Sequence, residues 1–128
     1  SLFTTPTEYA RFLIEMMRDD RSAKHSLSKA TLTAMLTPVS HDQENGRHYG
    51  LGWAIKQRPT GNLYSHGGSN GSGFRCYSRF DPKTKTGIVI MTNGIGGAEL
   101  HRALLKRIDR AIELLRPPDA HSNQTTDR

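Results

Sequence analysis

The sequence predicts an α+β fold, with an antiparallel sheet of three to four strands flanked by helices. Apolar residues recur at helical spacing in two segments near the N-terminus and in one long segment near the C-terminus. Between these segments, polar and apolar residues alternate in the pattern of strands. The links between the expected strands are short, which favours antiparallel pairing and therefore an α+β domain.

The composition fits one globular domain. Of the 128 residues, 34% are apolar and 23% are charged, and no apolar run is long enough for a transmembrane helix. The net charge is +6, from 18 basic and 12 acidic residues. The basic residues are scattered and lack interleaved aromatic residues, so we expect a basic surface and no nucleic-acid partner.

Start signals mark two helices near the N-terminus. Thr5, Pro6 and Glu8 form a capping box with a proline at the first helical position. The apolar face that follows consists of Tyr9, Phe12, Leu13, Met16 and Met17. A second, shorter helix is expected to begin after the cap residue Ser28 and to end before Pro38.

Residues 49–56 alternate between bulky side chains and the small residues Gly50, Gly52 and Ala54. This pattern predicts one strand with a bare face, against which another backbone or a helix packs closely.

Three further segments extend the expected sheet. Residues 62–66 and 74–80 form strands on either side of a glycine-rich loop, and the wholly apolar run 88–91 predicts a central strand buried on both faces. Cys76 is the only cysteine, which excludes an internal disulfide, and its place in a strand predicts a small buried residue.

An amphipathic helix is expected over residues 98–115, because apolar residues recur there on one face and Pro117 stops the pattern. We therefore expect one domain over residues 1–116. The polar residues 117–128 lack apolar anchors and are expected to form a disordered tail.

The stretch 64–74 contains four glycines and three serines around His66. Glycine allows backbone conformations and close approaches that other residues forbid, and such a loop beside a titratable side chain is typical of ligand sites. His66 judged by itself, however, is more often structural than catalytic.

Two catalytic motifs match only in spelling. Residues 67–71 spell G-x-S-x-G, but a nucleophile elbow needs a helix after its serine, and a strand pattern follows here. Ser26 and Lys29 spell S-x-x-K, but the cap residue Ser28 places Ser26 outside the helix that this chemistry needs. The glycines do not open a helix, as a phosphate loop would, and the histidines are far apart along the chain, so we expect no cofactor and no metal.

Five tracts, in order and with compatible spacing, together resemble the C-terminal part of the serine β-lactamase family. This family includes class C β-lactamases, D-alanyl-D-alanine peptidases of the penicillin-binding-protein type and related esterases. The resemblance covers residues 1–115. The tracts are SLFTTPTEYARFL at 1–13, YGLGW at 49–53, HGGS at 66–69, GF at 73–74 and IVIMTN at 88–93.

The family surrounds one cleft with three motifs, S-x-x-K, Y-x-N and K-T-G or H-x-G, and His66-Gly67-Gly68 matches the third. The resemblance implies that His66 presents a polar or cationic group to the substrate carboxylate or leaving group. It implies that Gly68 leaves room for the substrate backbone and that Gly67 and Asn70 also belong to the substrate-binding residues. The backbone N–H of Ser69 would then be one donor of an oxyanion hole.

The other two motifs are missing from this sequence. No tyrosine is followed by asparagine two residues on, and the one S-x-x-K match is outside a helix. The resemblance therefore implies the C-terminal segment of a serine hydrolase that forms an acyl-enzyme with a β-lactam, a D-alanyl peptide or an ester. We expect this chain to be inactive alone, because a donor without a nucleophile gives no acyl transfer.

Further expectations follow from this interpretation. The acyl substrate, of small-molecule or peptidoglycan type, and the missing N-terminal half would be the partners of the chain, and exposed strand edges would favour self-association. The family resemblance implies a periplasmic or extracellular location. The alternative is a non-catalytic binding module that keeps the sheet.

Overall fold

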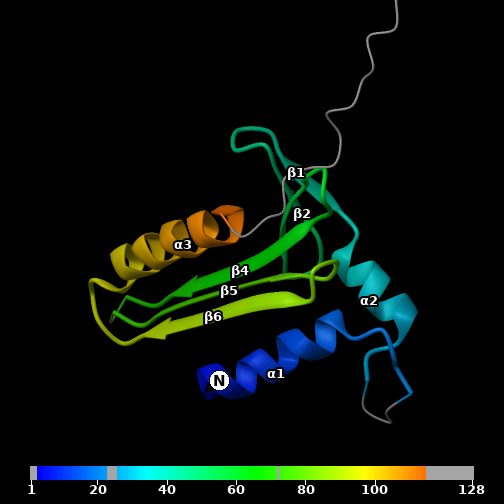
Figure 1. The fold of residues 1–128 in the computed structure, drawn as a ribbon, viewed down its shortest axis with the longest axis horizontal. Helices are drawn as coiled ribbons and strands as arrows, with labels where there is room; N and C mark the ends of the chain where they lie inside the picture. Colours follow the sequence, from blue (N-terminus) through cyan, green and yellow to red (C-terminus); the bar gives the residue numbers. More distant parts are fainter. Residues whose placement is uncertain (1–2, 23–25, 72, 115–128) are drawn as a thin grey trace, which may run out of the picture. The chain divides into compact units, whose positions relative to one another are not determined.

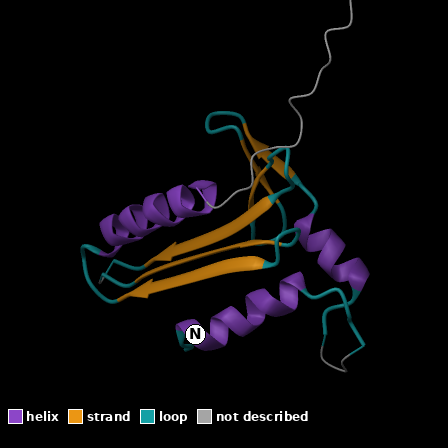
Figure 2. Ribbon diagram, viewed as in Figure 1, coloured by secondary structure: helices purple, strands orange, loops and turns teal. Residues whose placement is uncertain are grey.

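The computed structural model describes residues 3–22, 26–71 and 73–114. All strands belong to one antiparallel sheet in the order β1-β2-β3-β4-β5-β6 (Figures 1 and 2), so the α+β class is confirmed with more strands than expected. The predicted tail at 117–128 and the predicted helix residue Leu115 lie outside the described residues. The elements are α1 (Pro6–Met17), α2 (Lys29–Leu36), β1 (Ser40–Asp42), β2 (Arg47–Tyr49), β3 (Ala54–Lys56), β4 (Leu63–Ser69), β5 (Arg75–Asp81), β6 (Thr86–Thr92) and α3 (Gly97–Leu114).

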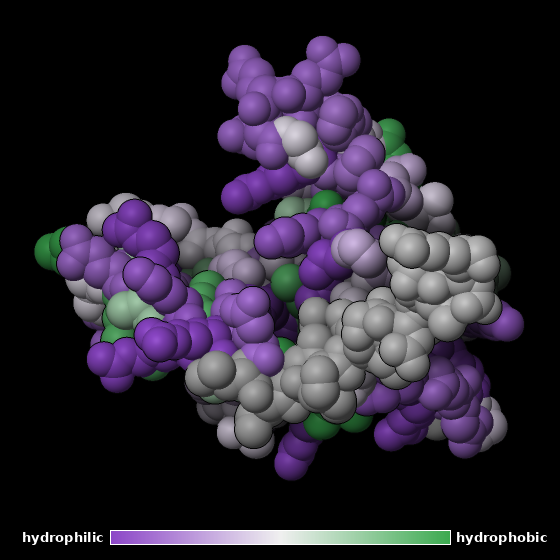
Figure 3. Space-filling model, turned by 45° about the horizontal axis from the view of Figure 1, so that its top comes forward, coloured by the Kyte–Doolittle hydropathy of each residue, from purple (hydrophilic) through white to green (hydrophobic). Residues whose placement is uncertain are grey.

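The chain divides into two compact units, residues 1–97 and residues 98–128. The first unit holds the sheet with α1 and α2, and the second holds α3 after its first residue. No helix in the described ranges is both long enough and apolar enough to cross a membrane. The face drawn in Figure 3 is largely hydrophilic, with hydrophobic residues in small separate patches.

Both helices of the first unit begin where their cap residues predict. The Thr5 side chain accepts a hydrogen bond from the Glu8 backbone N–H at 3.2 Å, and the Glu8 carboxylate accepts one from the Thr5 N–H at 3.3 Å. At the start of α2, Ser28 Oγ accepts the backbone N–H of Thr31 at 3.0 Å. These contacts satisfy N–H groups that have no partner within the first helical turn.

The core lies where α1 packs against β5 and β6 and extends to β3 and β4. Its buried apolar residues are Leu13, Met16, Met17, Trp53, Ile55, Tyr64 and Phe80. Phe80 has no exposed surface; its ring stacks on Tyr64 at 5.3 Å and meets Trp53 edge-on at 4.8 Å. Burying a side chain of this size stabilises a fold by about 1.5–3 kcal/mol, so this aromatic cluster is a main anchor of the sheet.

Residues 49–56 do not form the single strand that their alternation predicts. They contain the end of β2, a turn over residues 50–53, and β3. β2 ends at Tyr49 and β3 begins at Ala54, and these two residues are cross-strand partners. The N–H of Gly50 donates to the carbonyl oxygen of Trp53 at 2.8 Å and closes the turn. The alternation survives as burial of Trp53 and Ile55, which are 4% and 2% exposed and pack in the core.

The two glycines of this turn are needed for different reasons. A Cβ atom on Gly50 would collide with the carbonyl oxygen of Met35, so the predicted close approach of another backbone is present there. Gly52 has open space around it but a φ of +82°, which disfavours residues with a side chain. Leu51, which lies between the two glycines, is exposed. It therefore does not share a buried face with the other bulky residues of this segment.

Two burial predictions for the last strands are wrong. β6 is the final strand in the sheet order and not a central strand, and residues 88–91 are only half-buried. Cys76 on β5 is exposed and not buried. Its partner across the β4–β5 pair is Gly68, which has no side chain to cover the thiol.

A hydrogen bond in the turn after β4 determines which residues of β4 direct their backbone N–H and C=O groups toward β5. Asn70 donates its N–H to the carbonyl oxygen of Phe74 at 3.1 Å, next to the paired residues Ser69 and Arg75. Antiparallel strands alternate between directly hydrogen-bonded pairs and pairs whose backbone groups point outward. The backbone N–H and C=O groups of Ser69 and Gly67 therefore point away from β5.

A partly buried ion pair joins the turn after β3 to the end of β5. Asp81 Oδ2 lies 2.6 Å from Arg58 Nη2, while Oδ1 accepts the N–H groups of Lys83 and Thr84 at 2.9 and 3.2 Å. Burial raises the pKa of Asp81, but the hydrogen bond from Arg58, the two backbone N–H groups and the Arg58 charge outweigh burial and hold this pKa below its usual value.

Replacing Asp81 with asparagine should make the protein less sensitive to acid. The stabilisation from a carboxylate with a lowered pKa is fully present above the unfolded-state pKa of about 3.9 and is lost as the pH falls through the folded-state value. We expect Asp81→Asn to lower the free energy of unfolding at pH 7 by about 2 kcal/mol and to flatten its decline below about pH 4 in urea titrations. The exposed Asp19→Asn is the control, and an acid dependence unchanged by Asp81→Asn would contradict this role.

The outer edge of β6 should promote self-association. The same alternation of hydrogen-bonded and outward-pointing backbone groups applies to the β5–β6 pair. It directs the N–H and C=O groups of Gly87, Val89 and Met91 away from β5. The strand TGIVIMT has no charge or proline that would block pairing at this edge. We expect dimers at high concentration in size-exclusion chromatography with light scattering. Val89→Pro removes one outward N–H and should favour the monomer, whereas Val89→Thr keeps that N–H and should still dimerise. A wild-type chain that stays monomeric at high concentration would rule this out.

Candidate active site

The second half of β4 has one open edge. β5 pairs with β4 from Tyr64 to Ser69, whereas β3 pairs only with Leu63, Ser65 and the residue between them. Within the described part of the chain, no strand therefore lies against residues 66–69 on the β3 side. The backbone groups of Gly67 and Ser69 point to this open edge and can bond to a ligand placed there.

His66 lies on this strand with its ring orientation fixed. Its Nδ1 lies 2.8 Å from the carbonyl oxygen of Gly52. Because a carbonyl oxygen only accepts hydrogen bonds, Nδ1 carries the proton. The ring also meets Trp53 edge-on at a centroid distance of 6.2 Å. The exposed ring thus keeps Nε2 available as an acceptor when neutral and as a donor when charged.

Sequence reasoning about single residues missed the two supports of His66. Gly52 and Trp53 belong to the tract YGLGW. The sequence of this tract predicts an alternating strand and contributes to a family resemblance, but it predicts no contact with His66. The turn that contains them brings the Gly52 carbonyl oxygen to a residue fourteen positions further along the chain. The signal that could have found them is the pair of glycines on either side of Leu51, because closely spaced glycines indicate a tight turn.

The glycine-rich loop is shorter than predicted. β4 continues through Ser69, so Gly67, Gly68 and Ser69 belong to a strand, and the connecting turn begins at Asn70. Arg75 holds this turn, because its Nη1 donates to the carbonyl oxygens of Asn70 at 2.8 Å and of Phe74 at 3.0 Å. The five predicted site residues thus lie together on one strand and the first position of its turn.

Gly68 is in close contact with the neighbouring strand. A Cβ atom on Gly68 would lie 2.9 Å from Cys76 Sγ, which is closer than side-chain atoms approach one another. A Cβ atom on Gly67 would make only ordinary contacts of 3.7 Å, with the Cys76 carbonyl oxygen and the Tyr77 ring. Packing against Cys76 is therefore one structural reason for glycine at position 68.

The G-x-S-x-G and S-x-x-K spellings have no support in the structure. Ser69 lies in a strand, and the chain runs from its turn into β5 and not into a helix, so a nucleophile elbow is excluded. Ser26 precedes α2, and Ser28 is the residue that caps it. Ser26 Oγ is buried without a hydrogen-bond partner among the described residues, and Lys29 is exposed, so the Ser26–Lys29 pair does not form the hydrogen bond that activation of this serine needs.

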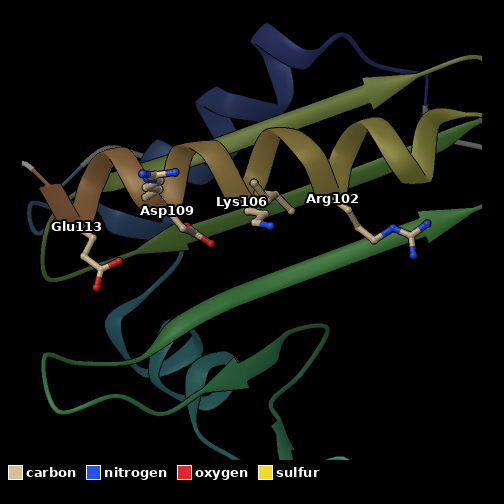
Figure 4. Close-up of a pocket in the computed structure, with 6 residues that line it drawn as sticks. Arg102, Lys106, Asp109 and Glu113 are labelled. Atoms are coloured by element: carbon tan, nitrogen blue, oxygen red, sulfur yellow. The ribbon is translucent and has the colours of Figure 1, made fainter.

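Two other features of the described chain do not form a comparable site. No group of three or more His, Cys, Asp or Glu side chains in these ranges could hold a metal ion. Figure 4 shows Arg102, Lys106, Asp109 and Glu113 along one side of α3. Lys106 and Asp109, three positions apart, set opposite charges side by side on an open helix surface, with a second cation before them and a second carboxylate after them.

The open edge of β4 can polarise a carbonyl group but supplies no nucleophile. A backbone N–H directed at a developing oxyanion stabilises acyl transfer, and an exposed imidazole can bind a carboxylate or exchange a proton. Acyl transfer also needs a serine, cysteine or similar group activated by a base. No such pair lies next to His66 or Ser69 in the structure described.

Comparison with known proteins gives one match. A family model described as Beta-lactamase matches residues 1–112. The searches of curated proteins and of solved structures returned no match. The matched range includes α1, the whole sheet and nearly all of α3.

The close approach of Gly68 to Cys76 can be measured. We expect Gly68→Ala to lower the free energy of unfolding by about 1–3 kcal/mol through overpacking, and Gly67→Ala to change it by less than about 0.5 kcal/mol. Adding Cys76→Ala to the Gly68→Ala chain should restore most of the loss, because the clash is with the thiol alone. Equal effects of the two alanine substitutions in urea unfolding would show that the thiol does not limit position 68.

Proposed function

The chain belongs to the Beta-lactamase family, and from this premise we propose that the strand from His66 to Ser69 forms one side of a serine-hydrolase active site. In the proposed reaction, a serine attacks the carbonyl carbon of an amide or ester and the leaving group departs with a proton. Water then hydrolyses the acyl-enzyme. The proposed substrates are β-lactams, D-alanyl peptides or esters, the classes handled by β-lactamases, penicillin-binding proteins and related esterases.

Ser69 is proposed to act through its backbone and not through its hydroxyl. The observation that carries this role is the direction of its N–H, which points from β4 to the open edge. An N–H held there can donate to the oxyanion of a tetrahedral intermediate without rearrangement. A complete oxyanion hole needs a second donor, which we assign to the N–H of the nucleophilic serine.

His66 is proposed to bind the substrate carboxylate or to assist the leaving group as the H of an H-x-G motif. The hydrogen bond from Nδ1 to the Gly52 carbonyl oxygen supports this role, because it leaves Nε2 as the nitrogen that meets a ligand. Gly67 and Gly68 are proposed to leave room for the substrate backbone along the strand. Asn70, exposed at the end of β4, would border the same substrate.

The nucleophile is proposed to come from a segment outside these residues. Neither a Y-x-N motif nor a helical S-x-x-K motif occurs in the sequence, and both belong to the N-terminal part of the family's catalytic domain. Without that part the chain should not turn over substrate. It would then complete a cleft only when a polypeptide segment with S-x-x-K and Y-x-N packs against the open edge.

A non-catalytic binding module is the second candidate. The open edge of β4 favours it, because an extended peptide can add to a strand edge through backbone hydrogen bonds without any nucleophile. The coding sequence upstream of this chain discriminates the two candidates. An encoded S-x-x-K and Y-x-N supports the hydrolase, and an unrelated sequence supports the binding module.

The hydrolase proposal is tested in two steps. The isolated chain should hydrolyse nitrocefin and p-nitrophenyl esters no faster than its His66→Ala variant. When the chain is joined to a family segment that carries S-x-x-K and Y-x-N, turnover should appear. Ser69→Pro, which removes the N–H, should then lower kcat by about 10²–10³-fold, whereas Ser69→Ala, which keeps it, should be nearly neutral.

Three results would contradict the proposal. Turnover by the isolated chain that Ser26→Ala abolishes would identify Ser26 as a nucleophile. Equal loss of activity in Ser69→Ala and Ser69→Pro would show that the hydroxyl matters and the N–H does not. Full activity of the joined chain with His66→Ala would remove His66 from the site.

A further inference from the structure

The hairpin of β1 and β2 brings together two histidines that are separated along the chain. His41 on β1 is the direct cross-strand partner of His48 on β2. Their rings stack with centroids 4.5 Å apart and planes inclined by 22°. His41 is exposed and His48 is half-buried, so solvent reaches the pair. No metal was expected from the sequence, because the spacing of these residues matches no common ligand motif.

The cross-strand positions of the two histidines suit metal coordination once the rings turn out of their stacked arrangement. Nitrogen atoms that bind one metal at about 2.0–2.1 Å in adjacent positions lie about 3 Å apart. Directly opposed residues of an antiparallel pair have Cβ atoms about 4.5–5.5 Å apart, and the histidine χ2 angle is broadly distributed. Both rings can therefore turn a nitrogen toward one ion without a change in the backbone.

From this geometry we propose that His41 and His48 form a two-imidazole site for a divalent transition-metal ion. Imidazole is a ligand that Zn²⁺, Ni²⁺ and Cu²⁺ share, whereas Mg²⁺ and Ca²⁺ prefer oxygen. Two protein ligands leave the remaining positions to water or to a small ligand. The site is thus an open one that exchanges its ion, and not a closed structural site.

The residues around the pair support a preformed hairpin. The Asp42 carboxylate is engaged in the turn, where it accepts the N–H groups of Glu44 at 3.0 Å and Asn45 at 3.2 Å and the Asn45 side-chain amide at 2.8 Å. Because side chains alternate along a strand, Asp42 and Arg47 lie on the opposite face from the two imidazoles.

An ion at this site would join β1 to β2. A ligand that binds only the folded chain raises its stability, so the metal should stabilise the hairpin end of the sheet. The site uses no residue of the β4 edge and does not depend on the hydrolase proposal.

The first test is a titration of the full chain with ZnCl₂ or NiCl₂ by isothermal calorimetry. We expect one ion per chain and a loss of affinity of about tenfold or more in either His41→Ala or His48→Ala, because each removes one arm of the chelate. Gln43→Ala changes an exposed residue in the turn of the same hairpin, leaves both imidazoles in place and is the matched control, which should bind as the wild-type chain does. Unchanged affinity in both hairpin variants would overturn the proposal.

A second measurement does not depend on whether the variants fold. Substoichiometric Cu²⁺ added to the wild-type chain should broaden the amide NMR signals of residues 40–49 before any others, because paramagnetic broadening falls steeply with distance from the ion. Broadening centred on His66, on His101 or on the residues after α3 would overturn the proposal, as would the absence of any binding. A thermal unfolding midpoint that rises with Zn²⁺ in the wild-type chain, and not in His48→Ala, would support it.

Discussion

The candidate site depends on the short pairing between β3 and β4. β3 contacts only the first three residues of β4, while β5 contacts β4 to its end. The strand from His66 to Ser69 is therefore held rigidly on one edge and left open on the other. Alternation of the backbone groups then determines which N–H groups face the open edge. A longer β3 would bond these groups and leave no edge for a ligand.

The turn before β3 explains why β3 begins only at Ala54, and therefore does not extend along the second half of β4. It also explains how His66 is oriented. Gly50 lies against the Met35 carbonyl oxygen, and the N–H of Leu51 donates to that oxygen at 3.0 Å, which ties the turn to the end of α2. Gly52 adopts a positive φ, and its carbonyl oxygen contacts the His66 ring. The same turn therefore connects a helix end, the start of a strand and the candidate catalytic histidine, while Trp53 beside it enters the core.

Family membership and catalytic competence are separate properties of this chain. The family match covers residues 1–112 and includes the strand with the H-x-G sequence, so the sheet and its open edge belong to a hydrolase fold. Acyl transfer needs a donor and an activated nucleophile within one cleft, and the described residues include the proposed donor but no activated nucleophile beside it. The paired histidines of the β1–β2 hairpin lie outside this arrangement and can have a chemistry of their own.

The sequence by itself determined the features that depend on neighbours within about four positions. The caps Thr5 and Ser28, the turn at Asp81 and the helical stripe that ends at Met17 follow from local hydrogen bonds and side-chain spacing. A site at His66–Asn70 is also predicted from the sequence, through a resemblance carried by several tracts, and its role stays a prediction. The tertiary structure decided what depends on distant partners. It split residues 49–56 into two strands, placed β6 at an edge, exposed Cys76 opposite Gly68, and brought His41 to His48. The side-chain alternation of one strand predicts which residues share each of its faces. It does not predict whether a strand, a turn or solvent lies beside its edges, because hydrogen bonds between strands join residues far apart in sequence.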